Sequence, residues 1–312
     1  MVTTWTLIRN PKASAGKCEK RWPAIAAALE SAGIPYEARV TESPRHAIAL
    51  TREAIARGAR NFIAVGGDGT ANEVANGILG QDVVDPLAIR LAQVPVGTGN
   101  DWGRSVGIPS KYHAAAALIR EAPEVIQDVG RVEFSGENGP QSRYFINIAG
   151  MGYDAYVGRE ANRAKAAGKG GLSTYVSTVL RCLTRYEPPD LNFAIDGKVQ
   201  PPERMFYLLV GICKYNGAGM KHCPHAIYDD GILDVTLIRP LSVLRSILNL
   251  PRLFNGSFVH LKEASLYTAQ SVRVEASPAA LLEVDGENIG MGPATFSILP
   301  RRLRVIGRGG KP

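Results

Sequence analysis

Apolar and amphipathic segments alternate along roughly the first 125 residues. The segments WTLIR, YEARV, NFIAV and LAQVPV have the length and the apolar character of buried strands. Apolar residues at helical spacing predict helices at about residues 17–32, 43–58, 70–80 and 111–121. Because parallel strands need crossover helices, this alternation predicts an α/β domain with a doubly wound, mainly parallel sheet.

Two of these helices carry capping signals at their starts. Ser43 followed by Pro44 predicts an N-cap with proline at the first helical position. Thr70 and Glu73 match a T-x-x-E capping box, which predicts a helix that starts at Thr70. Ligands of such sheets bind at the carboxyl ends of the strands. Three polar, glycine-rich loops are predicted to lie at that edge: NPKASAGK, GGDGTAN and GTGND.

The pattern changes near Asp128. Apolar and β-branched runs such as RYFINIAGMG, RMFYLLVGI and GILDVTLI recur between the turn signals IDGK and VDGEN, which predicts a mainly antiparallel β domain. Helical spacing interrupts these runs at residues 172–185 and 241–254, and we expect Pro251 to break the second helix. The predicted domains cover residues 1–127 and 128–312, with a last strand that can return to the first domain.

Composition limits the classes of function. The chain has 312 residues, of which 45% are hydrophobic and 21% charged, and no apolar stretch approaches the roughly 20 residues that cross a bilayer. The N-terminus lacks the pattern of a signal peptide, and the four cysteines contain no C-x-x-C, so we expect a cytoplasmic protein with reduced thiols. A net charge of +7 and a pI near 9.3 favour an anionic partner: nucleotide phosphate, a lipid surface or nucleic acid.

The segment VGGDGTANEV places three glycines around Asp68 at a strand-to-helix turn. Such a turn lets backbone N–H groups approach a bound phosphate, although a tight turn without a ligand has the same composition. It is no Rossmann fingerprint, since Asn72 stands at the third glycine, and NPKASAGKC fails as a Walker A loop because of Pro11 and Cys18. A carboxylate inside a phosphate site calls for a cation such as Mg²⁺.

Four motifs together carry a resemblance to a known family. They are GGDGT at 66–70, PVGTGND at 95–101, DDGILDV at 229–235 and VDGE at 284–287, in this order and across nearly the whole chain. The combination resembles the bacterial diacylglycerol kinase-like lipid kinases, relatives of sphingosine kinases and NAD kinases. GGDGT alone is shared with NAD kinases, so the combination is the more specific signal.

This resemblance implies an NAD kinase/diacylglycerol kinase-like fold with a β-sandwich second domain, ATP in the interdomain cleft, and transfer of the γ-phosphoryl group to a hydroxyl of a diacylglycerol-like lipid. The usual NPxSG turn appears as NPKASAGK, with its Ser-Gly pair displaced to Ser14 and Gly16. The nucleotide-binding positions that it implies are Asn10, Pro11, Lys12, Ser14, Thr41, Gly66, Gly67, Asp68, Gly69, Thr70, Asn72, Glu73, Thr98 and Asn100.

Acidic residues are candidates for metal binding. Asp68, Asp101 and Asp128 each lie near the end of a predicted element, and we expect them to hold the Mg²⁺ of the nucleotide, with solvation or helix capping as the alternative. The resemblance also implies a structural Mg²⁺ loop in AIYDDGILDV, where a simple β-turn is the alternative. Its ligands would be Ile227, Asp230 and Ile232.

Asp285 and Glu287 are candidates for the general base. They are two residues apart on a predicted hairpin, so in an extended strand both side chains face the same way. By resemblance this block supplies the base that accepts the hydroxyl proton. Spacing does not distinguish which of the two accepts it.

An apolar stripe in the helix at 172–185 is accompanied by basic residues. It either contacts an anionic membrane surface or packs on its own domain. The stripe consists of Leu172, Val176, Val179, Leu180 and Leu183, and the basic residues are Arg159, Arg163, Lys165, Lys169, Arg181 and Arg185.

Three functional hypotheses follow. The first is an ATP-dependent lipid kinase that uses Mg²⁺ and meets its substrate at a membrane. The second is a soluble kinase of the NAD kinase type, which the pair DDGILDV and DGE disfavours. The third is a basic nucleic-acid-binding protein, for which no aromatic-rich basic motif is present.

A zinc site is not expected. Cys213, His222, Cys223 and His225 fit no standard zinc spacing, and we expect them near the YNGAGM loop beside the lipid pocket. Oligomeric state is not encoded in a readable way, and a dimer is compatible with the sequence.

Overall fold

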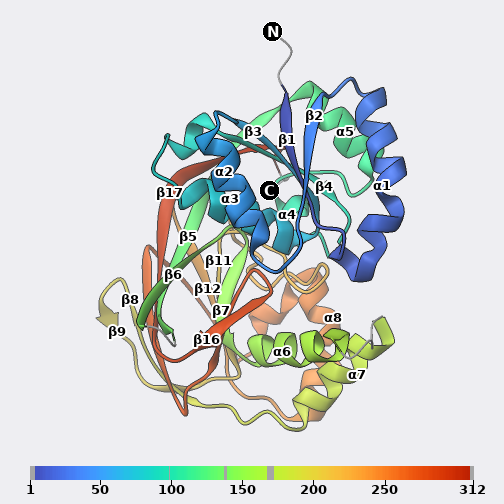
Figure 1. The fold of residues 1–312 in the computed structure, drawn as a ribbon. Coiled ribbons are helices and arrows are strands. Elements are labelled where there is room, and N and C mark those ends of the chain that lie inside the picture. The colour runs from blue at the N-terminus through green and yellow to red at the C-terminus, as the bar shows by residue number, and fades with distance from the viewer. Residues whose placement is uncertain (1–3, 98, 137–138, 167–171, 310–312) are drawn as a thin grey trace. The chain divides into compact units, whose positions relative to one another are not determined.

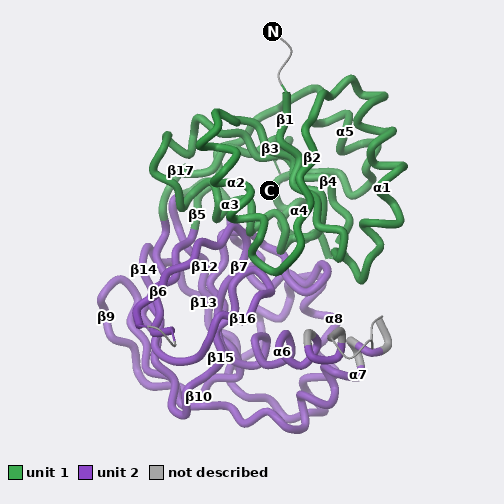
Figure 2. The backbone as a smooth tube through the Cα atoms, in the orientation of Figure 1, with its two compact units in different colours: residues 1–129, 228–230, 299–312 green, residues 130–227, 231–298 purple. Residues whose placement is uncertain are grey.

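The chain forms two compact units in a computed structural model that describes residues 4–97, 99–136, 139–166 and 172–309. Figure 2 shows unit 1 in green and unit 2 in purple. Unit 1 contains residues 1–129, 228–230 and 299–312, and unit 2 contains residues 130–227 and 231–298. The domain boundary expected after residue 127 stays a prediction.

Unit 1 is built on a parallel sheet (Figure 1). Strands β2, β1, β3 and β4 lie side by side in this order and run parallel. Arg304 and Val305 of β17 pair in parallel with Arg90 and Leu91 of β4 and so add a fifth strand. The bounds are β1 Trp5–Arg9, β2 Tyr36–Val40, β3 Asn61–Gly66, β4 Arg90–Pro95, β5 Glu124–Gly136 and β17 Ala294–Ile306.

Helices connect these strands by crossovers. The chain moves from β1 out to β2 and then back past β1 to β3 and β4, so right-handed crossovers put α1 on one face and α2 and α3 on the other. Helix α1 packs with α5, and α2 packs with α3. The bounds are α1 Ala13–Ser31, α2 His46–Ala56, α3 Asp68–Leu79, η1 Pro86–Ala88, α4 Asp101–Ser105 and α5 Tyr112–Glu121.

The predicted start of α2 is wrong. The helix begins at His46, after Arg45 with a left-handed φ of 65°, so Ser43 is not its N-cap. Glu73, which belongs to α3, caps this helix instead: its carboxylate accepts the N–H groups of Arg45 at 3.1 Å and Ala47 at 3.2 Å. A carboxylate is favourable there because the helix N-terminus is its positive end.

Unit 2 is built from antiparallel strands. One sheet has the order β13-β12-β11-β7-β15-β16. Elsewhere in this unit β14 pairs with β8 and with residues 294–297 of β17, β8 pairs with β9 and β10, and β5 pairs with β6. The bounds are β6 Gly139–Phe145, β7 Ile148–Gly152, β8 Asp190–Ile195, β9 Lys198–Val199, β10 Glu203–Arg204, β11 Tyr207–Gly211, β12 Leu233–Ile238, β13 Ala264–Ala269, β14 Ser271–Ser277, β15 Leu281–Val284 and β16 Glu287–Met291.

The helical elements of unit 2 within the described residues are α6 Tyr153–Ala166, α7 Leu172–Leu183, α8 Val243–Asn255 and the 3-10 turn η2 Ser257–His260. The predicted break at Pro251 is wrong, because α8 continues to Asn255 and ends at Gly256, which has a left-handed φ of 82°. The ring of Pro251 lies on an exposed part of the helix, where the missing N–H leaves no buried carbonyl behind. The sequence analysis did not predict α6.

The predicted fold class is confirmed. The N-terminal sheet is mainly parallel with helices on both faces, and the C-terminal sheet is antiparallel. Within the part of the chain that the structure describes, no helix combines the length and the apolar character needed to cross a bilayer.

Candidate functional site

Two glycine-containing loops of unit 1 touch through their backbones. Gly67 lies between β3 and α3, and Gly97 follows β4. A Cβ added at Gly97 would lie 2.9 Å from the Cα of Gly67, closer than real side chains approach. Glycine is therefore required by the close approach of the two loops. The helix after Gly67 begins at Asp68, so the predicted start at Thr70 is wrong and no Thr70–Glu73 capping box forms.

Asp68 connects these two loops through its carboxylate. One oxygen accepts the N–H of Asp101 at 3.1 Å and the other accepts the N–H of Trp102 at 3.2 Å. Burial, together with the nearby charge of Asp101, raises the pKa of Asp68 to about 6, against the opposing effect of these hydrogen bonds. A cation beside both carboxylates would favour the ionised form of Asp68.

Further predicted nucleotide-binding residues gather around the same loop. The Asn10 amide donates to the Thr70 hydroxyl at 3.3 Å, and its carbonyl accepts the Lys12 N–H at 3.1 Å. A Cβ at Gly66 would meet that Thr70 hydroxyl at 2.3 Å. These contacts connect the end of β1 to the first turn of α3.

The remaining nucleotide-binding candidates lie in different surroundings. Thr41 is buried at the end of β2, and its N–H donates to the carbonyl of Arg9 at 2.9 Å. Asn72 is buried within α3, and the Asn100 amide donates to the Gly97 carbonyl at 3.0 Å. Glu73 caps α2, as described above. Thr98 lies outside the described residues.

The displaced Ser-Gly pair changes the backbone after Pro11. Ser14, Ala15 and Gly16 have left-handed φ angles of 54°, 55° and 81°, which interrupt the start of α1. Regular helix therefore begins at about the predicted position, residue 17. Two non-glycine residues in this conformation are unusual, so the turn is held by its surroundings.

The three aspartates predicted to hold Mg²⁺ are not equivalent. Asp68 and Asp101 lie together; Asp101 is buried and Asp68 is half-buried. Asp128 is fully buried and accepts the N–H of Arg301 at 2.6 Å. Among the described residues, no cluster of three or more His, Cys, Asp or Glu side chains could hold a metal ion. Any Mg²⁺ at Asp68 and Asp101 would therefore need further ligands from water or phosphate, as is usual for this ion.

The second predicted metal loop is an exposed turn. Asp230 is exposed, and Gly231 has a left-handed φ of 75°. Ile227 is 49% exposed. The structural Mg²⁺ at Ile227, Asp230 and Ile232 stays a prediction.

Asp285 lies in unit 2, in the two-residue turn between β15 and β16. Its φ of 47° and the φ of 82° at Gly286 give the turn type that is preferred in tight hairpins. The Asp285 carboxylate accepts three backbone N–H groups, from Ile146 at 2.9 Å, Asn147 at 3.1 Å and Ile148 at 3.0 Å. This side chain therefore anchors the hairpin to the segment before β7.

Glu287 has different partners from Asp285. It forms an ion pair with the guanidinium of Arg143, whose side chain is 9% exposed. Asp285 has a left-handed φ, so Asp285 and Glu287 do not lie in the extended strand for which a common direction of their side chains was expected. The structure thus assigns the two acids different surroundings.

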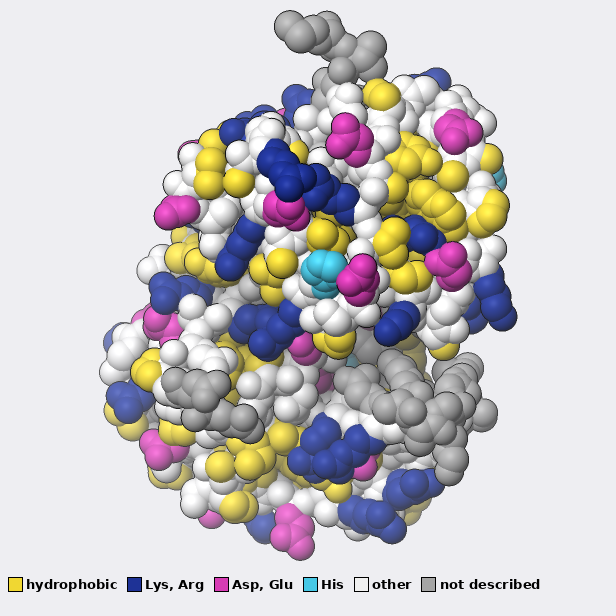
Figure 3. Space-filling view, viewed as in Figure 1, with side chains coloured by type: hydrophobic (Ala, Val, Ile, Leu, Met, Phe, Trp, Pro, Cys, Tyr) yellow, Lys and Arg dark blue, Asp and Glu magenta, His cyan; other side chains and the backbone are white. Residues whose placement is uncertain are grey.

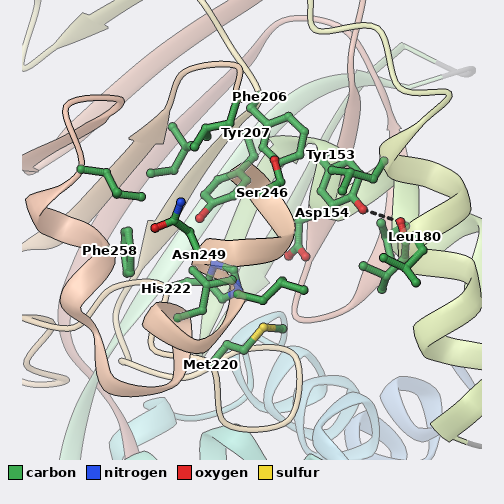
Figure 4. Close-up of a pocket in the computed structure, with 18 residues that line it drawn as sticks. Tyr153, Asp154, Leu180, Phe206, Tyr207, Met220, His222, Ser246, Asn249 and Phe258 are labelled. Carbon is green, nitrogen blue, oxygen red and sulfur yellow. Dashed lines mark hydrogen bonds between the residues drawn. The ribbon is translucent and has the colours of Figure 1, made fainter. Parts of the chain in front are cut away.

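An apolar cavity of about 110 Å³ lies within unit 2 (Figure 4). Tyr153 and Phe206 stack in its wall with ring centroids 4.4 Å apart, and the Tyr153 hydroxyl donates to the Val179 carbonyl at 2.7 Å, which connects α6 to α7. Among the described residues that line the cavity, Asp154 is the only acid. The lining residues are Tyr153, Asp154, Val157, Val179, Leu180, Leu183, Phe206, Tyr207, Met220, His222, Ile238, Leu241, Ser246, Asn249, Leu250, Leu253, Phe258 and Leu261.

Asp154, which is half-buried, forms a pair of acids with the buried Glu283. The Asn216 amide donates to Asp154 at 2.8 Å and also bonds Glu283. Gly158 lies one turn after Asp154, and a Cβ there would stand 3.2 Å from a Glu283 carboxylate oxygen. Burial raises the pKa of Asp154, and burial together with the charge of Asp154 raises the pKa of Glu283 well above its usual value. The charge of His222 opposes the rise at Asp154.

The apolar stripe predicted in the helix at 172–185 packs partly on its own unit. Val179 and Leu183 line the cavity, and Leu180 lines it while 39% exposed. The side chains of Leu172, Val176 and Lys165, as well as Lys169, lie outside the described residues. Membrane contact through this helix stays a prediction.

Comparison with known proteins covers both units. The model of the diacylglycerol kinase catalytic domain matches residues 4–132, and that of the YegS C-terminal NAD kinase beta sandwich-like domain matches residues 147–307. A diacylglycerol kinase of Mycobacterium tuberculosis is 30% identical over 302 residues, which cover 96% of this chain and 94% of that protein. The chain belongs to the diacylglycerol kinase family. The family resemblance inferred from the four motifs is thereby confirmed.

Solved structures show the same fold as this diacylglycerol kinase family member. A diacylglycerol kinase from Bacillus anthracis matches with a TM-score of 0.72 and 23% identity, over 98% of this chain and 97% of the other. An NAD kinase from Archaeoglobus fulgidus, solved in complex with ATP, matches with a TM-score of 0.52 and 11% identity, over 97% and 93%. The NAD kinase/diacylglycerol kinase-like fold is confirmed.

The pairing of Asp154 with Glu283 in this diacylglycerol kinase family member was not predicted from the sequence. One signal was available: Glu283 interrupts the apolar run LLEV, in which Leu282, Glu283 and Val284 are all buried. A carboxylate inside a buried strand needs a polar partner or a function. Asp154 had no comparable signal, because the helix that carries it was not predicted.

Proposed function

We propose that this protein is an ATP-dependent lipid kinase that transfers the γ-phosphoryl group of ATP to a hydroxyl of a diacylglycerol-like lipid. The apolar cavity of unit 2, with one carboxylate in its wall, is the observation that carries the choice of a lipid acceptor. Pockets for small molecules combine apolar walls with a few placed polar groups, as this one does. Membership in the diacylglycerol kinase family supports the kinase activity.

The nucleotide side of the proposal rests on unit 1. The backbone N–H groups at the start of α3 provide an anion-binding helix N-terminus beside Gly66 and Gly67. An NAD kinase of the same fold was solved with ATP, which supports ATP as the phosphoryl donor. Asp68 and Asp101 would hold a Mg²⁺, and this ion would neutralise charge on the phosphate oxygens. Two adjacent carboxylates fit such a cation, since the charge of Asp101 raises the pKa of Asp68 and a cation between them would offset this repulsion.

The acceptor side of the proposal rests on unit 2. An acyl chain would lie among the apolar residues of α6, α7 and α8, and Asp154 would accept a hydrogen bond from a hydroxyl at the polar end of the lipid. The block at Asp285 and Glu287 would supply the general base. Because three main-chain N–H groups already bond Asp285, we assign it the positioning of the hairpin and assign proton acceptance to Glu287.

A basic nucleic-acid-binding function has less support. In Figure 3 the Lys and Arg side chains are interspersed with Asp and Glu on the face shown and form no continuous stripe there. Binding to a nucleic-acid backbone would favour a basic track. The positive net charge suits a peripheral encounter with an anionic membrane equally well.

Label transfer tests the proposed function. The protein is incubated with Mg²⁺, ATP labelled in the γ-phosphoryl group, and phosphatidylcholine vesicles that carry diacylglycerol, phosphatidylglycerol or ceramide; NAD⁺ is offered in a separate reaction. We expect label on at least one lipid and none on NAD⁺. Asp68→Ala should lower the rate by about 10² to 10³-fold, whereas Asp82→Ala, at an exposed position of the same unit, should not. Labelled NAD⁺ without labelled lipid would favour the soluble kinase.

A further inference from the structure

Helix α8 exposes an apolar face to solvent. No residue of this helix, all of which the structure describes, is buried. Its exposed large side chains lie at spacings of one, four, five and eleven residues from the first, which places them on one side of a helix. We call this side the outer face of α8; it consists of Val243 (39% exposed), Leu244 (67%), Ile247 (39%), Leu248 (67%) and Phe254 (54%).

The opposite side of α8 has a partner. Ser246, Asn249, Leu250 and Leu253 line the cavity of unit 2. Leu250 and Leu253 on this side, together with the outer face, give α8 an apolar arc of about 220° of its circumference at 3.6 residues per turn. A helix that packs on one side of a globular protein needs an apolar stripe of about 100°. The outer face is therefore an excess of apolar surface that packing within unit 2 does not explain.

The helix is held firmly in this orientation. The Ser242 hydroxyl accepts the Arg245 N–H at its start, and Gly256 ends it in a left-handed conformation. Arg245 forms two hydrogen bonds with Glu263, at 2.6 Å and 3.2 Å. The N–H of Lys221 donates to the Leu253 carbonyl at 2.7 Å. The outer face is thus presented by a fixed element, with both ends and one side attached to unit 2.

Basic residues border the outer face, and two of them are paired with acids from other segments: Arg239 with Glu203 and Arg245 with Glu263. The sequence contains no Asp or Glu from residue 235 to residue 262, but it contains Arg239, Arg245, Arg252 and Lys262. Arg245 and Arg252 project from the part of the α8 circumference that the apolar side chains leave, next to Leu248. An apolar helix face bordered by arginines is the pattern of helices that lie in the interface of an anionic bilayer.

We propose that the outer face of α8 docks on the surface of an anionic lipid bilayer. The choice of a bilayer rests on the proposed function, since the inner side of the same helix lines the cavity assigned to the lipid acceptor. A second copy of the chain that docks through the same face would bring no acid toward Arg252 or Lys262, because its own outer face contains none. Anionic headgroups complement these two cations instead.

Vesicle co-sedimentation tests the docking. The unaltered protein should bind phosphatidylglycerol vesicles at least about tenfold more tightly than phosphatidylcholine vesicles, with an affinity that falls as salt is raised. Leu244→Glu with Leu248→Glu should weaken binding to phosphatidylglycerol vesicles at least tenfold. Val199→Glu is the matched control, since Val199 is 84% exposed on β9, outside the outer face. Equal binding by the α8 variant and the control would overturn the proposal.

A second measurement does not depend on the double variant. All four native cysteines are buried, so Leu248→Cys can be labelled with an environment-sensitive fluorophore. We expect its emission to shift to the blue with phosphatidylglycerol vesicles, and no shift with a label at Val199→Cys. Absence of a shift at position 248 would contradict the docking. So would a dimer of the unaltered protein that becomes a monomer in the double variant, because the outer face would then be a protein interface.

Kinase activity separates this proposal from the proposed function. On diacylglycerol in vesicles the double variant should lose activity in proportion to its lost binding. On a short-chain diacylglycerol below its aggregation concentration it should retain the activity of the unaltered protein. If vesicles bind as expected but no lipid is phosphorylated, the docking stands and the proposed function fails. If lipid is phosphorylated but vesicle binding does not depend on α8, the docking fails alone.

Discussion

The loops around Asp68 in unit 1 and the cavity around Asp154 in unit 2 both surround a half-buried carboxylate, but they are built differently. Main-chain N–H groups of the next loop bond Asp68, and glycines allow the two backbones to touch. Asp154 is bonded by the side chain of Asn216 and shares its surroundings with Glu283. A site made of main chain depends on a few glycines, whereas a site made of side chains depends on packing over the whole unit.

This difference affects what each region tolerates. In the unit 1 loops, an added methyl group would displace the backbone that forms the site. In the cavity, apolar side chains can be exchanged for others of similar volume at a small cost. We therefore expect substitutions at the loops to act on stability and nucleotide together, and substitutions in the cavity to act on the acceptor alone.

Asp285 distinguishes the effect of main-chain bonding from the effect of the unit. It belongs to unit 2, as Asp154 does, but main-chain N–H groups bond its carboxylate, as they bond that of Asp68. Asp285→Ala would remove the acceptor of three N–H groups and should lower the free energy of unfolding by about 3–4 kcal/mol. Urea denaturation measures this loss. Glu287→Gln, two residues away and 39% exposed, should cost no more than about 1 kcal/mol. Similar losses for both variants would refute the distinction between them.

Gly97→Ala tests the close approach of the two loops in unit 1. A Cβ there would meet the side-chain amide oxygen (Oδ1) of Asn100 at 2.6 Å and the Cα of Gly67 at 2.9 Å. We expect a loss of about 1–3 kcal/mol in the free energy of unfolding, as for other overpacked sites. Gly69→Ala is the matched control, because no atom lies within 4 Å of its added Cβ. A stable Gly97→Ala variant would show that the loops can separate.

Val179→Trp tests the cavity. The larger side chain would occupy space that we assign to the lipid acceptor, so lipid phosphorylation should fall about tenfold, while nucleotide affinity stays unchanged. Initial rates at varied lipid and equilibrium binding of nucleotide give the two readings. Val199→Trp, at an exposed position of the same unit, should alter neither. A matching loss of nucleotide affinity would mean that the two regions are not independent.

The smallest effect concerns pH. The raised pKa values of Asp154 and Glu283 mean that the folded state holds protons more tightly than the unfolded chain does. Their contribution to stability is therefore fully present below the unfolded-state pKa values, near pH 4, and is lost as pH rises through the higher folded-state values.

Glu283→Gln removes one of the two titrating groups. The urea midpoint of the unaltered protein should fall as pH is raised from 5 to 8, and that of the variant should fall less. Glu275→Gln, at an exposed position of β14, should keep the slope of the unaltered protein. An unchanged slope in Glu283→Gln would show that the pair does not titrate in this range.

Local patterns predicted the nucleotide loops well. Glycines and Asp68 are adjacent in the sequence, and both loops follow strands of a parallel sheet, so their meeting at one edge followed from topology. The N–H groups that bond the carboxylates of Asp68 and Glu73 could not be predicted from these local patterns. Both carboxylates cap a helix other than the one that carries them, and such contacts depend on how the helices pack.

Cavity residues could not be predicted in the same way. They come from segments between residues 153 and 261 that lie far apart in the sequence. Helix α6 was missed because AGMGYDAY begins with a strand-like run, and only the packing of Tyr153 on Phe206 and Val179 decides where the strand ends. The outer face of α8 was not predicted either. Four of its five residues precede Pro251, but their exposure depends on how the helix packs, which a local pattern does not specify.

The parallel pairing of β17 with β4 has a consequence for biosynthesis. Residues 304 and 305 add the last parallel strand to β2, β1, β3 and β4, which end by residue 95, and Leu303, Val305 and Ile306 are fully buried. A ribosome must therefore translate more than 200 further codons before the first unit acquires its fifth strand. During that interval one flank of β4 stays open to other chains, so chaperones that shield strand edges should meet this protein early.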